Sequence, residues 1–501
     1  MSKRIAEDSE GGAPLKGGDR PEPMDMDVDG DKEMGDFEDE FEDEFESEDE
    51  IFEAGVDGRP DAEREAEEKA AMDVDDTNGT FIVGRNKLEQ GQHLAPDLGT
   101  YEMLHSLTMP WPCLSFDIVR DRLGDKREAV YPATMYTVAG TQADSSNAKD
   151  NALMVLKFSG LSRQQRDDDS DSDGDDDGDD EESDPILEHR AVPLTSTTNR
   201  IRAHQIPSSD PSRPPTTLTA TMTESAQVYI HDVTPHLASF DNPGTIITPQ
   251  QNKPISTIRA HKSEGYALDW SPLVPGGKLL TGDNDGLIYA TTRTDGGGWV
   301  TDTRAFQGHT KSVEDIQWSP QEASVFASAS SDGTVRVWDV RSKSRKPAIT
   351  VQVSSTDVNV LSWSRLTTHL LATGADDGVW GVWDLRQWKG GADKPSPIAS
   401  FAYHKEQITS VEWHPTDDSM VAVAAGDHKV TLWDLSVEID DEESKDTAGV
   451  KDMPPQLLFE HISEHAKEVH WHPQIPGTIA ATGKEFGIFR PIPAVYGIHG
   501  K

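Results

Sequence analysis

Residues 308–339 read GHTKSVEDIQWSPQEASVFASASSDGTVRVWD. Two short segments of alternating apolar and polar residues flank the pair Asp332-Gly333. An Asp-Gly pair between two such segments is typical of a β-hairpin, because a tight turn favours these two residue types. The stretch opens on Gly-His, closes on Trp-Asp, and predicts a small antiparallel sheet.

The same pattern returns along the chain. Trp318, Trp363 and Trp413 each precede the Trp of a Trp-Asp pair by 20 residues, and those pairs are 45 and 50 residues apart. A fourth clear copy begins at His261. One sheet of this size cannot bury both of its faces alone, so the copies must stack against one another. The repeats therefore predict sheets that pack in a ring.

These motifs resemble the WD-repeat family, in which each repeat forms a four-stranded blade of a β-propeller. Weaker copies are found at residues 133–140 with 152–158, at 221–232 and at 465–483. We therefore expect an all-β, seven-bladed WD-repeat propeller over residues 113–495, with six or eight blades as the alternatives. The resemblance implies that one set of residues forms the buried hydrogen-bond network of a blade: His309, Ser328, Asp332 and Trp338.

The net charge of −45 is concentrated in two segments. Residues 1–80 hold 31 acidic and 8 basic residues, a net of −23, and residues 167–184 hold 13 acidic residues and no basic one. We expect 1–80 to be a disordered acidic tail and 160–187 to be a disordered acidic loop within the propeller. The acidity argues against a protein that coats DNA or RNA and favours a basic protein partner.

The acidic tail also carries aromatic residues at regular spacing. Phe37, Phe41 and Phe45 are four residues apart, so their rings would align if the segment became helical on a partner. The alternative is that the tail only keeps the protein soluble. The candidate client-binding residues of both tracts are Phe37, Glu38, Phe41, Glu42, Phe45, Asp167, Asp168, Asp175, Asp176, Asp179 and Asp180.

A third, smaller acidic segment lies near the C-terminus. Residues 436–455 contain Asp440-Asp441-Glu442-Glu443 and end on Pro454-Pro455. The sequence then continues as Gln-Leu-Leu-Phe-Glu-His over 456–461. An acidic loop followed by Pro-Pro-x-Leu-Leu-Phe-x-His closely resembles the histone-binding, or retinoblastoma-binding, branch of WD-repeat proteins. We also expect residues 457–459 to form the first strand of the last blade.

The segment before the propeller supports the same resemblance. Over residues 96–107, Leu98, Tyr101, Leu104 and Leu107 are three apart, which predicts a short helix, and residues 81–112 form the helix and its link to the first blade. In this branch the helix and the Pro-Pro loop frame a groove for a basic amphipathic helix. The matching positions are Leu98, Tyr101, Leu104, Asp440, Asp441, Glu442, Glu443, Pro454, Pro455, Leu457, Leu458 and Phe459.

The acidic tail and loop together with this propeller resemble the glutamate-rich WD-repeat family, whose fungal members are called regulators of ribosome biosynthesis. The resemblance implies a nuclear and nucleolar assembly factor, with cytoplasmic shuttling as an option. It also implies a basic client, large-subunit ribosomal protein three, which the factor escorts as a dedicated chaperone. Contact with pre-ribosomal particles would then be indirect.

The sequence offers no pattern typical of an enzyme. It contains no nucleophile elbow, phosphate loop or kinase signature, and Cys113 is the only cysteine. We expect no cofactor, no metal, no membrane span and no sequence-specific contact with nucleic acid. Two alternative functions remain: a histone-binding chromatin protein, and an adaptor of a cullin ubiquitin ligase. The latter is suggested by the Trp-Asp-x-Arg motifs at 338–341 and 383–386.

Overall fold

The structure is a computed structural model that describes residues 96–164, 184–210, 212–388, 395–437 and 453–492. Phe37, Glu38, Phe41, Glu42 and Phe45 of the tail lie outside these ranges. So do the loop candidates Asp167, Asp168, Asp175, Asp176, Asp179 and Asp180, and the groove candidates Asp440, Asp441, Glu442 and Glu443.

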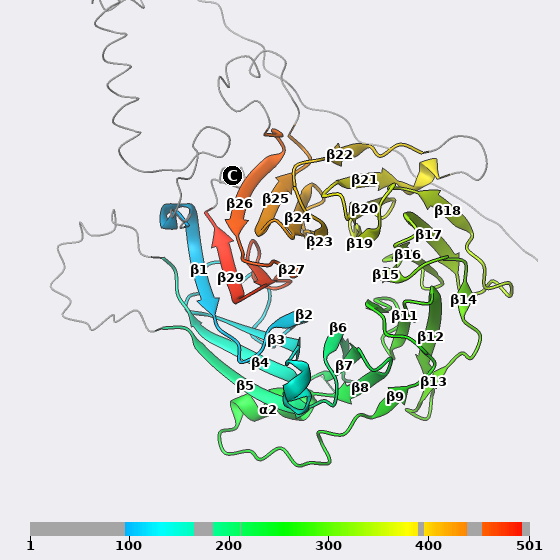
Figure 1. Cartoon of the computed structure of the whole chain (residues 1–501). Helices are drawn as coiled ribbons and strands as arrows, with labels where there is room; N and C mark the ends of the chain where they lie inside the picture. The colour runs from blue at the N-terminus through cyan, green and yellow to red at the C-terminus, as the bar shows by residue number, and fades with distance from the viewer. Residues whose placement is uncertain (1–95, 165–183, 211, 389–394, 438–452, 493–501) are drawn as a thin grey trace, which may run out of the picture. The chain divides into compact units, whose positions relative to one another are not determined.

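Seven antiparallel sheets stand around a central axis, which confirms the seven-bladed propeller (Figure 1). Blades 1 to 3 consist of β2 (Cys113–Val119), β3 (Ala133–Thr141), β4 (Ala152–Leu161) and β5 (Ile186–Pro193); β6 (Thr198–Ile206), β7 (Thr216–Thr223), β8 (Val228–Asp232) and β9 (Ser256–Ile258); and β10 (Ala267–Trp270), β11 (Lys278–Gly282), β12 (Leu287–Arg293), β13 (Trp299–Thr301) and β14 (Phe306–Gln307). Blades 4 to 6 consist of β15 (Val313–Trp318), β16 (Val325–Ser330), β17 (Thr334–Asp339) and β18 (Ile349–Gln352); β19 (Val358–Trp363), β20 (Leu370–Ala375), β21 (Trp380–Asp384) and β22 (Ala399–Phe401); and β23 (Ile408–Trp413), β24 (Met420–Ala425), β25 (Lys429–Asp434) and β26 (Leu457–Ile462).

Blade 7 is built from both ends of the described chain. Its first three strands are β27 (Glu468–Trp471), β28 (Ile479–Thr482) and β29 (Phe486–Pro491), and its outer strand is β1 (Tyr101–Leu107). The register pairs Leu107 with Phe486, and Figure 1 shows β1 beside β29. The ring is thus closed by hydrogen bonds between the N-terminal and C-terminal strands.

This closure corrects the helix expected over residues 96–107. Only Leu98–Thr100 is helical there, as one 3-10 turn, and the strand β1 follows it directly. Tyr101, Met103 and Leu107 alternate with more exposed residues in β1, which is the two-residue period of a strand. In the part of the chain that the structure describes, the one α-helix is α2 (Thr234–Asp241), between β8 and β9 of blade 2.

The outer strand of blade 6 gives a second correction. Leu457, Leu458 and Phe459 belong to β26, which pairs with β25, with Leu432 opposite Phe459. They therefore complete blade 6 rather than begin the sheet of the last blade. The expectation erred because a repeat, read along the sequence, begins with the strand that closes the preceding sheet.

The hydrophobic core lies between neighbouring blades. Trp338 of β17, Phe326 of β16 and Phe306 of β14 pack against one another, with the Phe326 and Trp338 rings stacked at 5.8 Å. Trp338 is 1% exposed, and full burial of a large side chain contributes roughly 2–3 kcal/mol. Such interfaces recur around the ring, because each sheet covers one face of the next.

Candidate partner-binding site

The predicted groove residues that the structure describes lie where blade 6 meets blade 7. Tyr101 of β1 is 3% exposed, and its ring meets that of Phe459 edge to face at 5.2 Å. Its hydroxyl lies 2.9 Å from Nδ1 of His461 in β26. Burial lowers the pKa of His461 to about 4, so the ring is neutral and accepts the Tyr101 proton at Nδ1. Tyr101 therefore joins the two outer strands and is not itself a contact surface.

Partly buried side chains next to Tyr101 form the surface of the groove. Leu104 of β1 and Leu458 and Phe459 of β26 pack on the core between blades 6 and 7 and remain partly exposed. We call these three residues the apolar strip. Leu98 is 55% exposed at the 3-10 turn, whereas Leu457 packs on the opposite side of the sheet, between blades 5 and 6. The structure thus brings together most of the predicted apolar positions but places Leu457 elsewhere.

The Pro-Pro segment leads into β26. The carbonyl oxygen of Pro454 accepts a hydrogen bond of 3.0 Å from the Leu457 amide, while Pro455 is exposed. The Gln456 side chain donates to the carbonyl oxygen of Val437 at 3.0 Å. The two ends of the acidic segment 438–452 are therefore held at the start of β26.

The acidic loop that contains residues 167–184 also begins beside β1. The Gln164 amide donates to the Glu102 carbonyl oxygen at 2.8 Å, and the Gln164 side chain donates to that of Leu104 at 3.1 Å. Nε2 of His105 lies 3.0 Å from the Ser162 carbonyl oxygen. Residues 162–164 thus cover part of the outer edge of β1. The sequence analysis missed these contacts, because nothing in residues 162–164 marks β1 as their partner.

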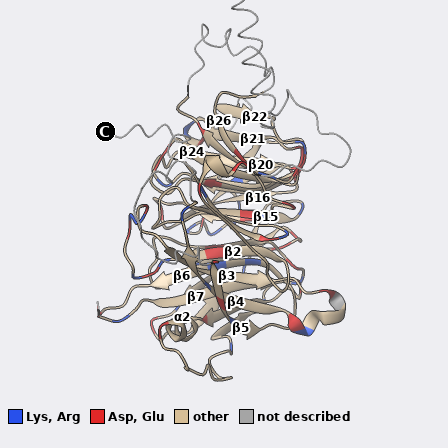
Figure 2. Cartoon of the chain, turned by 90° about the vertical axis from the view of Figure 1, so that its left-hand side faces the viewer, with Lys and Arg blue, Asp and Glu red and all other residues tan. Residues whose placement is uncertain are grey.

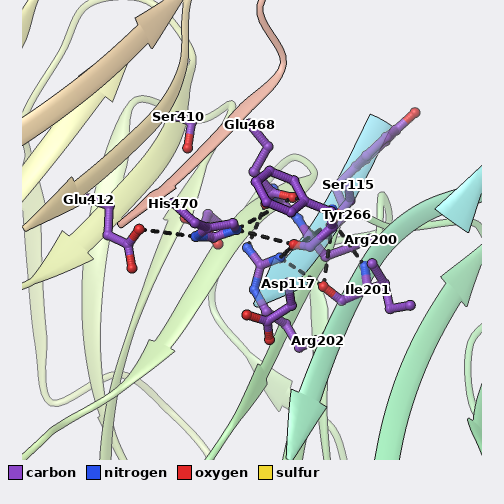
Figure 3. Close-up of polar contacts among 12 residues, drawn as sticks. Ser115, Asp117, Arg200, Ile201, Arg202, Tyr266, Ser410, Glu412, Glu468 and His470 are labelled. Atoms are coloured by element: carbon purple, nitrogen blue, oxygen red, sulfur yellow. Dashed lines mark hydrogen bonds and ion pairs between the residues drawn. The ribbon is translucent and has the colours of Figure 1, made fainter. Parts of the chain in front are cut away.

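A second polar site, which the sequence did not predict, lies in the central channel. The channel encloses about 400 Å³ and is lined by the first strands of all seven blades. Figure 3 shows Arg200 and Arg202 of β6 directed toward Glu468 of β27. Each guanidinium is 2.7 Å from Oε1 of Glu468, and Oε2 accepts the Phe116 amide of β2 at 2.8 Å. One carboxylate therefore ties blade 7 to blades 1 and 2.

His470 extends this network toward blade 6. Its Nδ1 is 3.1 Å from Oε2 of Glu412, and its Nε2 is 3.7 Å from Oε2 of Glu468. Burial lowers the pKa of His470, but the two carboxylates outweigh burial and raise the pKa to about 10. Burial likewise raises the pKa of Glu468, but Arg202 and Arg200 outweigh it and hold the pKa well below its ordinary value. At neutral pH both groups are charged.

The other channel carboxylates bind backbone amides of the neighbouring blade. Figure 2 shows acidic positions on β2 and β15 among strands that are mostly uncharged. Burial raises the pKa of Asp269 to about 7. Carboxylates that accept amide hydrogen bonds hold adjacent strands together and are not arranged around a nucleophile. The bonds are Asp117 to Ala203 N at 2.8 Å, Asp269 to Trp318 N at 2.7 Å, Asp315 to Leu361 N at 3.0 Å and Glu412 to Trp471 N at 2.9 Å.

The predicted blade network is assembled in blade 4. Nδ1 of His309 lies 3.0 Å from Oδ2 of Asp332, and Nε2 lies 2.7 Å from Oγ of Ser328. The Trp338 indole donates to the same Oγ at 2.8 Å. Burial lowers the pKa of His309, so the neutral ring donates from Nδ1 and accepts at Nε2. These four side chains stabilise the blade from within.

Among the described residues, no group of three or more His, Cys, Asp or Glu side chains could hold a metal ion. No helix of the described ranges is long and apolar enough to cross a membrane.

Comparison with known proteins places these features in a family. Residues 91–162 match a family described as histone-binding protein RBBP4 or a component of the CAF1 complex. Residues 301–339 and 395–434 match the WD domain, G-beta repeat.

Three relatives are similar over most of their length. Ribosome assembly protein rrb1 of Schizosaccharomyces pombe is 45% identical over 456 residues, which cover 90% of this chain and 92% of that protein. Protein HEAT STRESS TOLERANT DWD 1 of Arabidopsis thaliana is 42% identical, over 81% of this chain and 90% of that protein. Glutamate-rich WD repeat-containing protein 1 of Dictyostelium discoideum is 42% identical, over 81% of this chain and 84% of that protein.

Proposed function

Because this chain belongs to the glutamate-rich WD-repeat family, with ribosome assembly protein rrb1 among its relatives, we propose that it is a ribosome assembly factor without enzymatic activity. Its role is to escort a newly made, basic ribosomal protein until that protein is built into the large subunit. The family resemblance names large-subunit ribosomal protein three as the client. The work takes place in the nucleus and nucleolus.

The observation that carries this proposal is the position of the acidic segments around the apolar strip. The tail, with a net charge of −23 over residues 1–80, precedes β1 in the chain. The tract at 167–184 follows Gln164, which is bonded to β1, and the segment 438–452 leads into β26. Three segments far apart in the sequence therefore have their attachment points at one corner of the ring.

That arrangement suits a basic amphipathic segment. The apolar strip of Leu104, Leu458 and Phe459 would bury the apolar side of the segment, and the acidic segments would attract its cationic side. Binding would shield the basic surface of a ribosomal protein from unrelated RNA. Ribosomal RNA carries a far denser negative charge and would displace the escort during assembly.

Affinity purification with mass spectrometry tests the proposal. The intact protein should recover a large-subunit ribosomal protein, and Leu458→Asp should reduce its recovery at least tenfold. The matched control is Ile246→Asp, because Ile246 is 84% exposed in blade 2, away from the apolar strip. Recovery of histones with no ribosomal protein would overturn the proposal.

Deletion of residues 167–184 tests the acidic loop separately. The fold should remain intact, since the deleted residues lie between β4 and β5. Client binding should weaken most at low ionic strength, where charge attraction is least screened. Equal binding at every salt concentration would show that the loop only keeps the protein soluble.

Histone binding is the second candidate, favoured by the match of residues 91–162, which include β1, to the histone-binding family. Both clients would use the same apolar strip, so competition in a purified system separates them. A ribosomal protein should displace a histone H3–H4 pair if ribosome assembly is the main role.

The third candidate, a cullin ligase adaptor, rests on two arginines. Arg341 and Arg386 each bind the Asp of their own Trp-Asp pair, at 2.7 Å from Asp339 and from Asp384. These ion pairs explain the arginines by local structure. Failure to co-purify with the adaptor subunit of the ligase would remove this candidate.

A further inference from the structure

Three blades hold a buried imidazole between a carboxylate and a hydroxyl. In each of them the histidine precedes the first strand of the blade and Nδ1 faces an aspartate. The three sets are His261 with Asp283 and Thr281, His309 with Asp332 and Ser328, and His404 with Asp427 and Thr431. The Nδ1 distances to the carboxylate are 2.8, 3.0 and 3.1 Å.

Blade 5 has the partners of such an imidazole but not the imidazole itself. Thr373, Asp377 and Trp383 follow Ser328, Asp332 and Trp338 by 45 residues each. The indole of Trp383 donates to Oγ1 of Thr373 at 2.9 Å, as Trp338 does to Ser328 at 2.8 Å. The position 45 residues after His309 is Ser354.

A cavity lies at this position. It encloses about 220 Å³, and its lining includes Ser354, Thr373, Asp377 and Trp383. The Ser354 hydroxyl does not fill the space, because it bonds to Oγ1 of Thr356 at 3.0 Å. Asp377 is exposed, so the cavity is open to solvent on the side of its carboxylate.

The polar atoms of the cavity leave one donor and one acceptor free. Thr373 accepts from Trp383, and among the described residues nothing accepts its hydroxyl proton. Oδ1 of Asp377 accepts the Val379 amide at 3.1 Å, while Oδ2 has no partner within the described ranges. A neutral imidazole carries one N–H and one lone pair on opposite sides of a planar ring. It would donate to Asp377 and accept from Thr373.

We propose that this cavity of blade 5 is a binding site for an imidazole group. The group would occupy the space that His309 fills in blade 4 and would make the same two hydrogen bonds. A polar cavity of this size holds water, so binding exchanges ordered water for a ring that meets the same polar atoms. Two sources carry this chemistry: a free imidazole compound, and a histidine side chain of a bound protein.

The test uses the full chain with ¹⁵N-labelled tryptophan and imidazole as the probe. The indole N–H signal of Trp383, identified by its loss in Trp383→Phe, should shift on titration with millimolar imidazole at pH 8. Imidazole at about 100 mM should also raise the melting temperature by about 1–2 °C. Ser354→His should fill the cavity and abolish both effects, whereas Ser354→Ala should keep them.

A matched cavity in blade 4 makes the test decisive. His309→Ala should create the same arrangement there, so that the Trp338 signal responds to imidazole. If Trp338 responds in that variant while Trp383 does not respond in the natural chain, the proposal is overturned. It is also overturned if Ser354→His and the natural chain shift alike, because the effect is then unspecific.

A blocked tripeptide, acetyl-Gly-His-Gly-amide, distinguishes the two sources. A Trp383 shift with both probes supports a histidine side chain as the ligand. A shift with imidazole alone supports a free small molecule, since the peptide backbone is then excluded. No shift with either probe contradicts the site.

Discussion

Blade 4 and blade 7 are sheets of the same ring, yet different interactions stabilise them. Blade 4 is formed by one continuous segment, from β15 to β18, and its polar network joins residues of that segment or just before it. Blade 7 combines β27–β29 with β1 from the other end of the ring sequence. Its main polar contact, Glu468, reaches side chains of blade 2 and the backbone of blade 1.

The difference separates two tasks. The repeat motif holds each blade together from within, so it recurs and can be recognised. Closing the ring requires contacts between blades that are distant in sequence, and a single set of charges provides them. Variants in each network should therefore differ in the size of their effect.

The largest loss of stability should follow Glu468→Gln. Arg200 and Arg202 have side-chain exposures of 13% and 19%, and the change removes the charge that both share. Breaking a buried ion pair on one side costs about 3–5 kcal/mol. Denaturant unfolding followed by tryptophan fluorescence measures the loss. Glu188→Gln is the control, because its ion pair with Lys157 is more exposed and should contribute less than about 1 kcal/mol. Equal losses would refute the role of Glu468.

The pH dependence of stability should depend on the same network. The pKa of His470 is raised to about 10 in the folded state, above its ordinary value of 6.5. Its contribution is therefore complete below about pH 6.5 and is lost as the pH rises through about 10. The melting temperature should fall more between pH 8 and pH 10 in the natural chain than in His470→Gln. Parallel curves would contradict this.

A smaller loss should follow His309→Ala in blade 4. The change leaves Asp332 and Ser328 without their buried partner and opens a cavity, at a cost of about 2 kcal/mol. Ser354→Ala in blade 5 is the comparison, because that blade has no imidazole at the matching position, and its cost should be near zero. The same unfolding assay applies. Similar losses in both variants would mean that the imidazole contributes little.

The smallest effect should come from Tyr101→Phe at the closure. The variant removes the hydroxyl bond to His461 but keeps the ring packed on Phe459, so about 1 kcal/mol is expected. Tyr229→Phe provides a control within one strand, since its hydroxyl bonds to Gln227 at 3.3 Å. Differential scanning calorimetry would show a larger shift for Tyr101→Phe, and a larger shift for Tyr229→Phe would reject the role of Tyr101 in closure.

The propeller could be predicted because its signals are local. Asp332-Gly333 marks a hairpin, and the spacing from Trp318 to Trp338 marks a blade. The strand β1 was missed because Leu98, Tyr101, Leu104 and Leu107 fit a helical spacing, while the alternating burial of Tyr101–Leu107 appears only when β29 pairs with it. A partner so distant in sequence leaves no local pattern.

The candidate site was predictable to a similar degree. The apolar strip could be found through Leu104, Leu458 and Phe459, because the motif that carries them is contiguous. Residues 162–164 and the channel network could not be found, since they depend on which strands become neighbours. One signal was available for the channel: Arg200, Arg202 and Glu468 are charged positions on strands that are otherwise mostly apolar and uncharged polar.

The pairing of Tyr101 with Pro491 has a consequence for how the protein is made. The two residues are 390 positions apart, so joining them costs about 5 kcal/mol of chain entropy if nothing else has formed. At about 5–20 residues per second, a ribosome needs roughly 20–80 s to proceed from one to the other. During that time the strand β1 has no partner, and six blades can form while the ring stays open. An escort of other newly made proteins is thus itself unfinished for most of its own synthesis.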